Sequence, residues 1–148
     1  MKVLAISSAG GHWVQLRRLK PAFAEFDTAY ASVFPAYADD VKGHRFHTFD
    51  DVSRFHKERL LTVPFQLLKI LLKERPQVVI TTGSFPALIC LVMAKYLFGS
   101  HTIWIDSIAN CEQMSTSGRN ARRFADVWLT QWEHLAAPDG PGYLGAVL

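Results

Sequence analysis

The feature that most constrains this chain is a glycine turn close to its amino terminus. Met1–Ile6 is an apolar run typical of a short strand, and Trp13–Phe26 carries apolar residues at helical spacing. Between them stands Ser7-Ser8-Ala9-Gly10-Gly11-His12. A strand, a glycine turn and a helix make the first unit of an α/β fold, and ligands bind at this edge of open parallel sheets. The turn therefore predicts both a fold class and the place of a binding site.

Other short segments rich in Val, Ile, Phe, Trp and Thr predict further strands. The strands are expected near Lys2–Ser7, Thr28–Phe34, Arg45–Phe49, Val78–Thr82, Thr102–Asp106 and Val127–Gln131. Helical patterns lie between most of them, at His12–Phe26, Pro64–Glu74, Pro86–Phe98 and, more briefly, Gly118–Ala125. Strands that alternate with helices predict a parallel sheet with helices on both faces. We therefore expect a single Rossmann-like α/β domain over residues 1–148.

The composition agrees with one folded domain. Of the 148 residues, 49% are apolar and 20% are charged, and no polar tract interrupts them. Cys90 and Cys111 form neither a CxxC pair nor a disulfide framework, which fits a reducing cytosol. Met1 leads almost directly into the first strand, so no signal peptide is expected. No His/Cys cluster has zinc spacing, and neither a metal nor a cofactor is expected.

The net charge of +3 is modest but unevenly placed. The basic residues form three groups, namely Arg17, Arg18 and Lys20, then Arg54, Lys57 and Arg59, and then Arg119, Arg122 and Arg123. Aromatic residues are not interleaved with these groups as single-stranded nucleic-acid binding requires, so no nucleic-acid partner is expected. An anionic small ligand or an anionic membrane surface fits better. Solvated helix faces remain the alternative for at least one basic group.

Two very apolar helices bear on membrane contact. Pro86–Phe98 is shorter than the ~20 residues that cross a hydrocarbon core, so burial against the sheet is expected for it. Leu60–Leu72 is apolar on nearly all sides and has basic residues around it, namely Lys57, Arg59, Lys69 and Lys73. Burial and peripheral membrane contact are both open for this second helix.

Polar residues follow several of the expected strands, where the carboxyl ends of parallel strands meet at one edge of the sheet. Small and hydroxyl-bearing turns that feed a helix amino terminus are suited to binding an anion. With Ser8, Gly10 and Gly11 of the first turn, the candidate acceptor- or phosphate-binding residues are Gly83, Ser84, Asp106, Ser107, Ser117, Gly118 and Arg119. Such turns at one sheet edge predict a binding cleft.

His12 is the imidazole placed by the first glycine turn. A neutral histidine there has the chemistry to take a proton from a sugar hydroxyl, as glycosyl transfer requires. The alternative is a helix-start residue that hydrogen-bonds to a loop carbonyl. His44 and His47 with Asp50 are better explained by a polar strand edge than by a metal site. No G-x-S-x-G elbow supports a serine hydrolase.

The motifs in their order resemble the acceptor-side half of the split glycosyltransferases. The resemblance rests on Ser8–His12, Arg75–Gly83, Ile105–Ser107, Ser117–Arg119, Ala125-Asp126, Gln131–Glu133 and Tyr143–Gly145. The family includes the membrane-anchored subunit that adds the second N-acetylglucosamine to dolichol-linked oligosaccharide. It also includes bacterial capsule and exopolysaccharide half-transferases. The chain departs from the family in having Asp106 and Asn110 where glutamate and arginine are frequent.

The resemblance implies a fold like the amino-terminal half of a GT-B glycosyltransferase. It further implies that the glycine turn faces the diphosphate of a lipid-linked acceptor, that His12 is the candidate base, and that a partner chain binds the nucleotide sugar. The expected function is that of a non-autonomous transferase subunit at the cytoplasmic face of the cell membrane. A free-standing nucleotide- or phosphate-binding module without transferase activity is the alternative.

The segments Gln131–Glu133 and Tyr143–Leu148 discriminate between these hypotheses. A free-standing module has little use for the apolar end Tyr143–Leu148, whereas a subunit needs a surface for its partner. The residues assigned to partner binding are Trp132, Glu133, Tyr143, Leu144 and Gly145.

Overall fold

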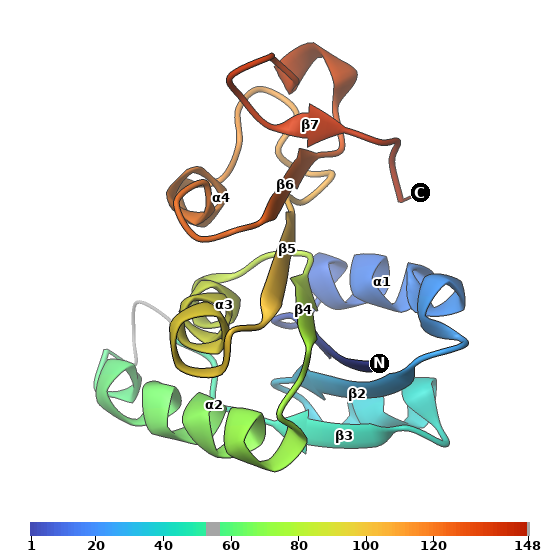
Figure 1. Cartoon of the computed structure of the whole chain (residues 1–148), viewed down its shortest axis with the longest axis vertical. Helices are drawn as coiled ribbons and strands as arrows, with labels where there is room; N and C mark the ends of the chain where they lie inside the picture. Colours follow the sequence, from blue (N-terminus) through green and yellow to red (C-terminus); the bar gives the residue numbers. More distant parts are fainter. Residues whose placement is uncertain (53–56, 148) are drawn as a thin grey trace.

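The protein is built on the expected parallel sheet (Figure 1). The computed structural model describes residues 1–52 and 57–147. Its strands are β1 (Lys2–Ile6), β2 (Asp27–Ser32), β3 (Arg45–Thr48), β4 (Val78–Thr81), β5 (His101–Ile105), β6 (Val127–Thr130) and β7 (Gly142–Tyr143). They pair in parallel in the order β3-β2-β1-β4-β5-β6-β7. The prediction of a Rossmann-like α/β domain is confirmed.

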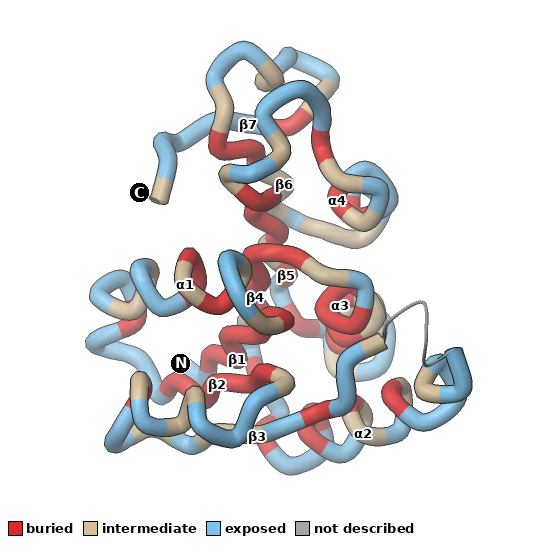
Figure 2. The backbone as a smooth tube through the Cα atoms, turned by 180° about the vertical axis from the view of Figure 1, so that it is seen from behind, coloured by how far each residue is buried: buried red, intermediate tan, exposed pale blue. Residues whose placement is uncertain are grey.

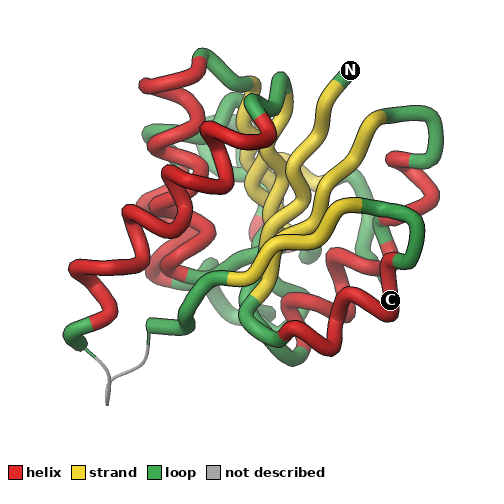
Figure 3. Tube along the Cα trace, turned by 90° about the horizontal axis from the view of Figure 1, so that it is seen from below, coloured by secondary structure: helices red, strands yellow, loops and turns green. Residues whose placement is uncertain are grey.

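Helices cover the two faces of this sheet, as Figure 3 shows from below. The α-helices are α1 (Gly11–Arg18), α2 (Arg59–Glu74), α3 (Phe85–Phe98) and α4 (Thr116–Ala121), and the 3-10 helices are η1 (Lys20–Phe23), η2 (Pro35–Val41) and η3 (Glu133–Leu135). Helices α2 and α3 pack against each other on one face, and α4 contacts α3 there. Helix α1 lies on the opposite face. This division follows from the strand order. From β1 the chain adds β2 and β3 on one side of β1, and it then returns to add β4 to β7 on the other side, so the two sets of connections cover opposite faces.

The core forms on both sides of the sheet because side chains alternate along each strand. In β1, Leu4 and Ile6 belong to the cluster under α2 and α3, whereas Val3 and Ala5 belong to the cluster under α1. Figure 2 shows that the buried segments gather on the strands and the inner sides of the helices. Burial of both faces fixes the register of the strands and therefore the positions of the turns that follow them.

Several element boundaries differ from the sequence-based prediction. The helix expected over His12–Phe26 ends at Arg18, and a 3-10 turn follows it. Pro21 is the physical cause, because proline lacks an N–H and disfavours helical geometry in the residue before it. Helix α2 begins at Arg59, ahead of the expected Pro64, so Pro64 lies inside the helix, where the missing N–H leaves one i→i−4 hydrogen bond unmade.

The chain end forms an edge strand that the sequence did not predict. Leu129 pairs with Gly142 and Thr130 with Tyr143, in parallel. Beyond β7, Val147 N donates to Gln131 Oε1 at 2.7 Å. Part of the expected apolar end therefore docks on this domain; its last residue, Leu148, lies outside the described residues.

Candidate functional site

The candidate site lies at the carboxyl ends of β1 and β4, where the strand order reverses. The turn after β1 runs into α1 on one face of the sheet, and the turn after β4 runs into α3 on the other face. The point at which they diverge is the position where ligands of α/β proteins commonly bind. The turn of Gly10 and Gly11 and the turn of Gly83 and Ser84 thus meet as neighbours, as expected from the sequence.

The first turn presents free backbone donors. Gly10 is the N-cap of α1 with φ 70°, a left-handed conformation that favours glycine. The first internal bond of the helix runs from Val14 N to Gly10 O at 3.1 Å. Within the described part of the chain, no acceptor bonds the amides of Gly11, His12 and Trp13. These amides and the positive end of α1 favour an anion.

The turn after β4 holds His12 in place. His12 Nδ1 lies 3.0 Å from Thr82 O, and Thr82 Oγ1 donates to His12 O at 2.6 Å. A carbonyl oxygen only accepts, so Nδ1 is the ring nitrogen that carries the proton when the ring is neutral. Nε2 of the half-buried ring then carries the lone pair, and none of the described residues bonds it.

The ring of His12 packs so closely on Gly83 that a side chain at position 83 would clash with it. A Cβ added to Gly83 would lie 2.9 Å from both Cε1 and Nδ1 of the ring, and φ at Gly83 is 122°. The next residue, Ser84, also has φ 122°, which is unusual for a side chain other than glycine. Its hydroxyl oxygen accepts from Ala87 N at 3.2 Å and thereby caps α3. Strained backbone of this kind gathers at functional sites.

Ser8 and Ser107 lie in the first and third turns, and both are buried. The carbonyl of Ser8 accepts from the hydroxyls of Ser7 and Ser32 at 3.1 and 3.3 Å. Ser107 Oγ accepts from Gln15 Nε2 at 3.2 Å, which ties the turn after β5 to α1.

Asp106 is buried, and its carboxylate is engaged within the protein. It accepts from Ser115 N at 2.9 Å, Ser115 Oγ at 2.7 Å, Asn110 Nδ2 at 3.2 Å and Trp104 Nε1 at 3.1 Å. A Cβ on Gly118 would come within 2.3 Å of Asp106 Oδ1. The geometry therefore makes Asp106 the organiser of the loop that leads into α4. Ser115 caps α4, and a serine before a helix is a recognisable cap signal in the sequence.

The remaining candidates lie further along the sheet edge. Arg119 is exposed on α4 and donates to Gln113 Oε1 at 3.0 Å and to Thr116 Oγ1 at 3.4 Å. Ser117 is half-buried on the same helix. Among the described residues, no hydrogen bond joins either of them to the His12 turn. The structure brings Gly10, Gly11 and Gly83 together with His12, and it places α4 at the end of β5.

A buried amide network links α1 to the carboxyl-terminal segment. Gln131 Nε2 donates to Gln15 Oε1 at 2.6 Å and to Asp106 O at 2.9 Å, while Gln131 Oε1 accepts from Val147 N. Gln15 lies on α1 one turn beyond His12 and was not singled out in the sequence. The network fixes the tail against the helix that carries His12.

The residues assigned to partner binding lie at the β6–β7 end of the sheet. Trp132 Nε1 donates to Ile108 O at 2.7 Å, so this ring is anchored in the domain, whereas Glu133 is exposed. Tyr143 is exposed at 38% and Leu144 at 83%. Gly145 follows with φ 115°. An apolar, solvent-facing segment thus continues the sheet edge beyond β7.

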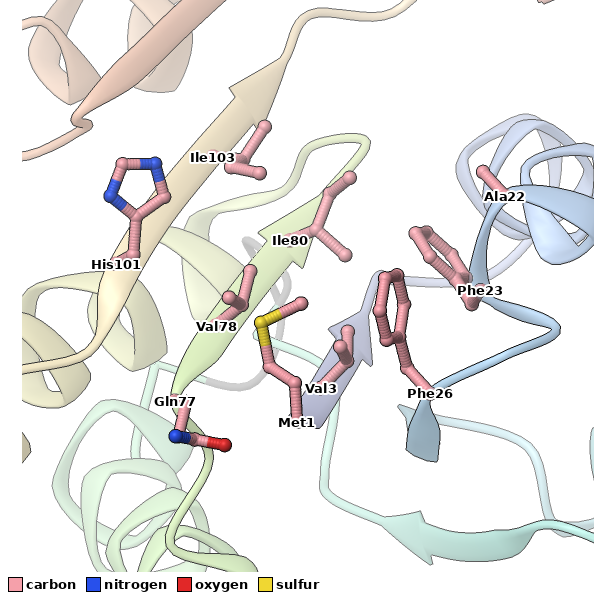
Figure 4. A pocket seen from close by; sticks show the side chains of 10 residues that line it. All are labelled: Met1, Val3, Ala22, Phe23, Phe26, Gln77, Val78, Ile80, His101 and Ile103. Atoms are coloured by element: carbon pink, nitrogen blue, oxygen red, sulfur yellow. The ribbon is translucent and has the colours of Figure 1, made fainter.

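A separate apolar groove lies at the opposite edge of the sheet (Figure 4). Phe23 and Phe26 face Val78, Ile80 and Ile103 across a cavity of about 540 Å³. Its residues come from the first and middle parts of β1, β4 and β5 and from the segment around η1, and the residues of the His12 turn do not line it. It offers almost no polar partner for a phosphate or a sugar.

Over residues 1–52 and 57–147, no group of three or more His, Cys, Asp and Glu side chains is arranged to hold a metal ion. His47 instead pairs with Glu74, which also accepts from Arg45. Burial opposes ionisation of Glu74, but the hydrogen bonds from Arg45 and His47 outweigh it and lower the pKa of this carboxyl. No helix in these ranges combines the length and apolarity needed to cross a membrane.

Comparison with known proteins finds one matching family model and several solved structures of similar fold. The family model "Oligosaccharide biosynthesis protein Alg14 like" matches residues 58–147. No curated protein matches the chain by sequence. Among solved structures, MurG of Acinetobacter baumannii is similar with a TM-score of 0.75 at 12% identity, over 99% of this chain and 45% of that chain.

Two further solved structures are similar in fold. The UDP-GlcNAc 2-epimerase from Neisseria meningitidis, bound to UDP-GlcNAc, has a TM-score of 0.65 at 10% identity, over 90% of this chain and 41% of its own. Anabaena Alr3699/HepE, in complex with UDP and glucose, has a TM-score of 0.56 at 17% identity, over 88% of this chain and 37% of its own. The chain spans less than half of each of these relatives and has the fold of one half of a GT-B glycosyltransferase.

Proposed function

Because the chain belongs to the family of Alg14-like oligosaccharide biosynthesis proteins, we propose that it is the acceptor-binding subunit of a two-chain glycosyltransferase. In this proposal the complex transfers a sugar from a nucleotide sugar to a lipid-diphosphate-linked saccharide at the cytoplasmic face of the cell membrane. This chain supplies the acceptor site and the catalytic base, and a partner chain supplies the nucleotide-sugar site. The family and the MurG-like fold support a glycosyltransferase-related role in oligosaccharide biosynthesis.

The geometry of His12 carries the finer assignment. Because Nδ1 is engaged by Thr82 O, the lone pair of a neutral ring is on Nε2. Nε2 is then able to accept the proton of an acceptor hydroxyl. The hydroxyl oxygen attacks the anomeric carbon of the donor sugar, and the nucleoside diphosphate leaves. The carbonyl of Thr82 stabilises the imidazolium that results, much as an orienting acceptor does in other general-base pairs.

The amides of the first turn supply the second requirement. The N–H groups of Gly11 and His12 face outward from the start of α1 and provide donors for phosphate oxygens. A diphosphate bound there lies beside the ring of His12. In this arrangement the lipid diphosphate is an anchor, and the sugar attached to it brings its hydroxyl to Nε2.

The partner requirement gives a direct test. We expect the purified chain to release no nucleoside diphosphate from a nucleotide sugar when a lipid-diphosphate acceptor is present. Adding a chain that supplies the donor half is expected to start transfer. The measurement is nucleoside diphosphate release, followed with each chain alone and with the two together.

Turnover by this chain alone would contradict the two-chain proposal. Tight nucleotide binding by the chain, with no gain of activity from any donor half, would favour the free-standing module instead. A second test is Leu144→Ser, which changes the exposed segment assigned to the partner without touching the His12 turn. We expect it to weaken co-purification and to leave the melting temperature unchanged.

We further propose that α2 touches the membrane on which the acceptor lies. Leu61, Phe65 and Leu72 are spaced by four and seven residues and therefore form one stripe along the helix. Leu61 is exposed at 76% and Phe65 at 73%, although both are large and apolar. Lys69 and Lys73 lie on the adjacent side, where they line a hollow beside β3.

The side of α2 opposite the exposed stripe packs against the core of the domain. Val63, Leu67 and Leu71 pack into the core, so the helix has a buried apolar face as well as the exposed stripe. Core packing explains why the buried face is apolar, but it does not explain why the exposed stripe is apolar. The start of α2 lies at the same sheet edge as the His12 turn, because both follow the carboxyl ends of strands. An apolar stripe flanked by lysines is suited to the boundary between headgroups and acyl chains.

Replacing Leu61 and Phe65 with serine is expected to weaken binding to vesicles that contain anionic lipid by ~10-fold or more. The double change Lys69→Glu and Lys73→Glu is expected to act similarly and to remove the salt dependence, since each cation contributes ~1 kcal/mol near such a surface. Sedimentation with vesicles measures both effects. Leu97→Ser is the matched control, because Leu97 is an exposed leucine of α3. Equal binding of all variants would contradict membrane contact by α2.

A further inference from the structure

We infer that the Tyr37 hydroxyl is a further phosphate ligand of the glycine turn. This inference rests on the proposed function, because the phosphate is that of the proposed acceptor. Tyr37 belongs to η2, between β2 and β3. Its side chain reaches across from the end of β2 to the turn after β1.

The inference rests on the hydrogen bonding of the Tyr37 hydroxyl, which accepts one bond and donates none to a described residue. Gly10 N donates to Tyr37 Oη at 3.1 Å, so the hydroxyl acts as an acceptor at the N-cap of α1. A tyrosine hydroxyl also has one proton to donate. No described residue is an acceptor for that proton, and because Tyr37 is only partly buried, water can accept it in the free protein. A ligand at the turn can therefore replace that water as the acceptor.

The ring of Tyr37 is held firmly, which fixes its hydroxyl. It stacks on Trp13 with ring centroids 4.9 Å apart and an angle of 2° between the planes. Trp13 Nε1 donates to Asp40 Oδ2 at 2.9 Å, and Arg17 pairs with Asp40 at 3.1 Å. The hydrogen bond from Trp13 and the nearby Arg17 hold the pKa of Asp40 below its ordinary value. The cluster thus presents the hydroxyl in one position without the cost of ordering it on binding.

The surroundings favour an anionic oxygen as the acceptor of this proton. A hydroxyl that accepts a hydrogen bond becomes a stronger donor, so the amide of Gly10 strengthens the donor of Tyr37. The free amides of Gly11 and His12 stand in the same turn, and the positive end of α1 adds to the attraction. A phosphate at this place would satisfy the turn amides and the hydroxyl together.

Titration of the full chain with inorganic pyrophosphate tests the inference, with the amide signals of Gly10, Gly11 and His12 followed by NMR. We expect the wild type to bind and Tyr37→Phe to raise the Kd by ~10-fold or more, which is the scale of one lost hydrogen bond to a charged group. Phenylalanine keeps the stacking on Trp13, so the fold is retained. Tyr96→Phe removes the same atom from an exposed tyrosine of α3 and is expected to leave the Kd unchanged.

A second variant separates ligand binding from support of the turn. Asp40→Ala loosens the cluster behind Tyr37 but keeps the hydroxyl, and we expect it to raise the Kd clearly less than Tyr37→Phe does. If Tyr37→Phe binds pyrophosphate as well as the wild type, or if Asp40→Ala weakens binding as much as Tyr37→Phe does, the inference is overturned while the proposed function stands. If pyrophosphate leaves the turn signals of the wild type unmoved at millimolar concentration, the phosphate site itself fails, and the proposed function fails with it.

Discussion

Replacing His12 with alanine is expected to lower the kcat of the two-chain complex by ~10²–10⁴, the usual contribution of a general base. The reason is the loss of Nε2, the ring nitrogen that Thr82 leaves unprotonated by engaging Nδ1. Acceptor binding is expected to change much less, because the backbone amides of the turn remain. Initial rates at varied acceptor concentration separate the two effects.

Two further variants make this result interpretable. His101→Ala removes an exposed histidine at the start of β5, on the opposite edge of the sheet, and is expected to leave kcat unchanged. His12→Gln keeps polar atoms at the site without a base of comparable strength, so it is expected to resemble alanine. Wild-type rates in both His12 variants would reduce this histidine to a structural residue of the helix start.

The sequence predicted the fold well because the signals for it are local. Alternating strands and helices with short turns define a parallel α/β sheet, and the apolar run Val78–Ile80 marks a central strand. The boundaries were less accurate where one residue overrides a pattern. Apolar spacing favoured a helix to Phe26, yet Pro21 ends α1 at Arg18. A two-residue strand such as β7 has too little pattern to be recognised, since pairing with β6 alone defines it.

The parts of the candidate site that are formed by backbone turns could be predicted from the sequence. Gly10 and Gly83 were found because glycine turns at strand ends are visible in one sequence, and the strand order brings them together at the switch point. The side-chain roles depend on distant contacts and were not visible. Asp106 was taken as a ligand candidate but is engaged by the loop it organises, and Tyr37 reaches the turn from a segment with no motif. Such residues are found only when the tertiary structure is known.

Substituting Gly83 with alanine is expected to lower kcat by ~10²-fold or more, close to the effect of removing His12 itself. The added Cβ would stand 2.9 Å from two atoms of the His12 ring, which is closer than real Cβ contacts allow. The ring must then leave its place against Thr82 O, and Nε2 loses its fixed orientation. The φ of 122° adds strain of ~1–3 kcal/mol for a residue with a side chain, so the melting temperature is expected to fall as well.

Gly11→Ala is the matched comparison for Gly83→Ala. A Cβ at Gly11 meets only Gln15 Nε2, at 3.9 Å, and its φ is not in the left-handed range, so the fold tolerates it. The same atom would enter the space proposed for a phosphate, and its cost is therefore expected in the KM for the acceptor with little change in melting temperature. Gly83→Ala is expected to act on kcat, with altered NMR signals of the His12 ring before any ligand is added. If both variants changed only stability, the two turns would be structural elements of the sheet edge, and the assignment of base and phosphate site to them would be wrong.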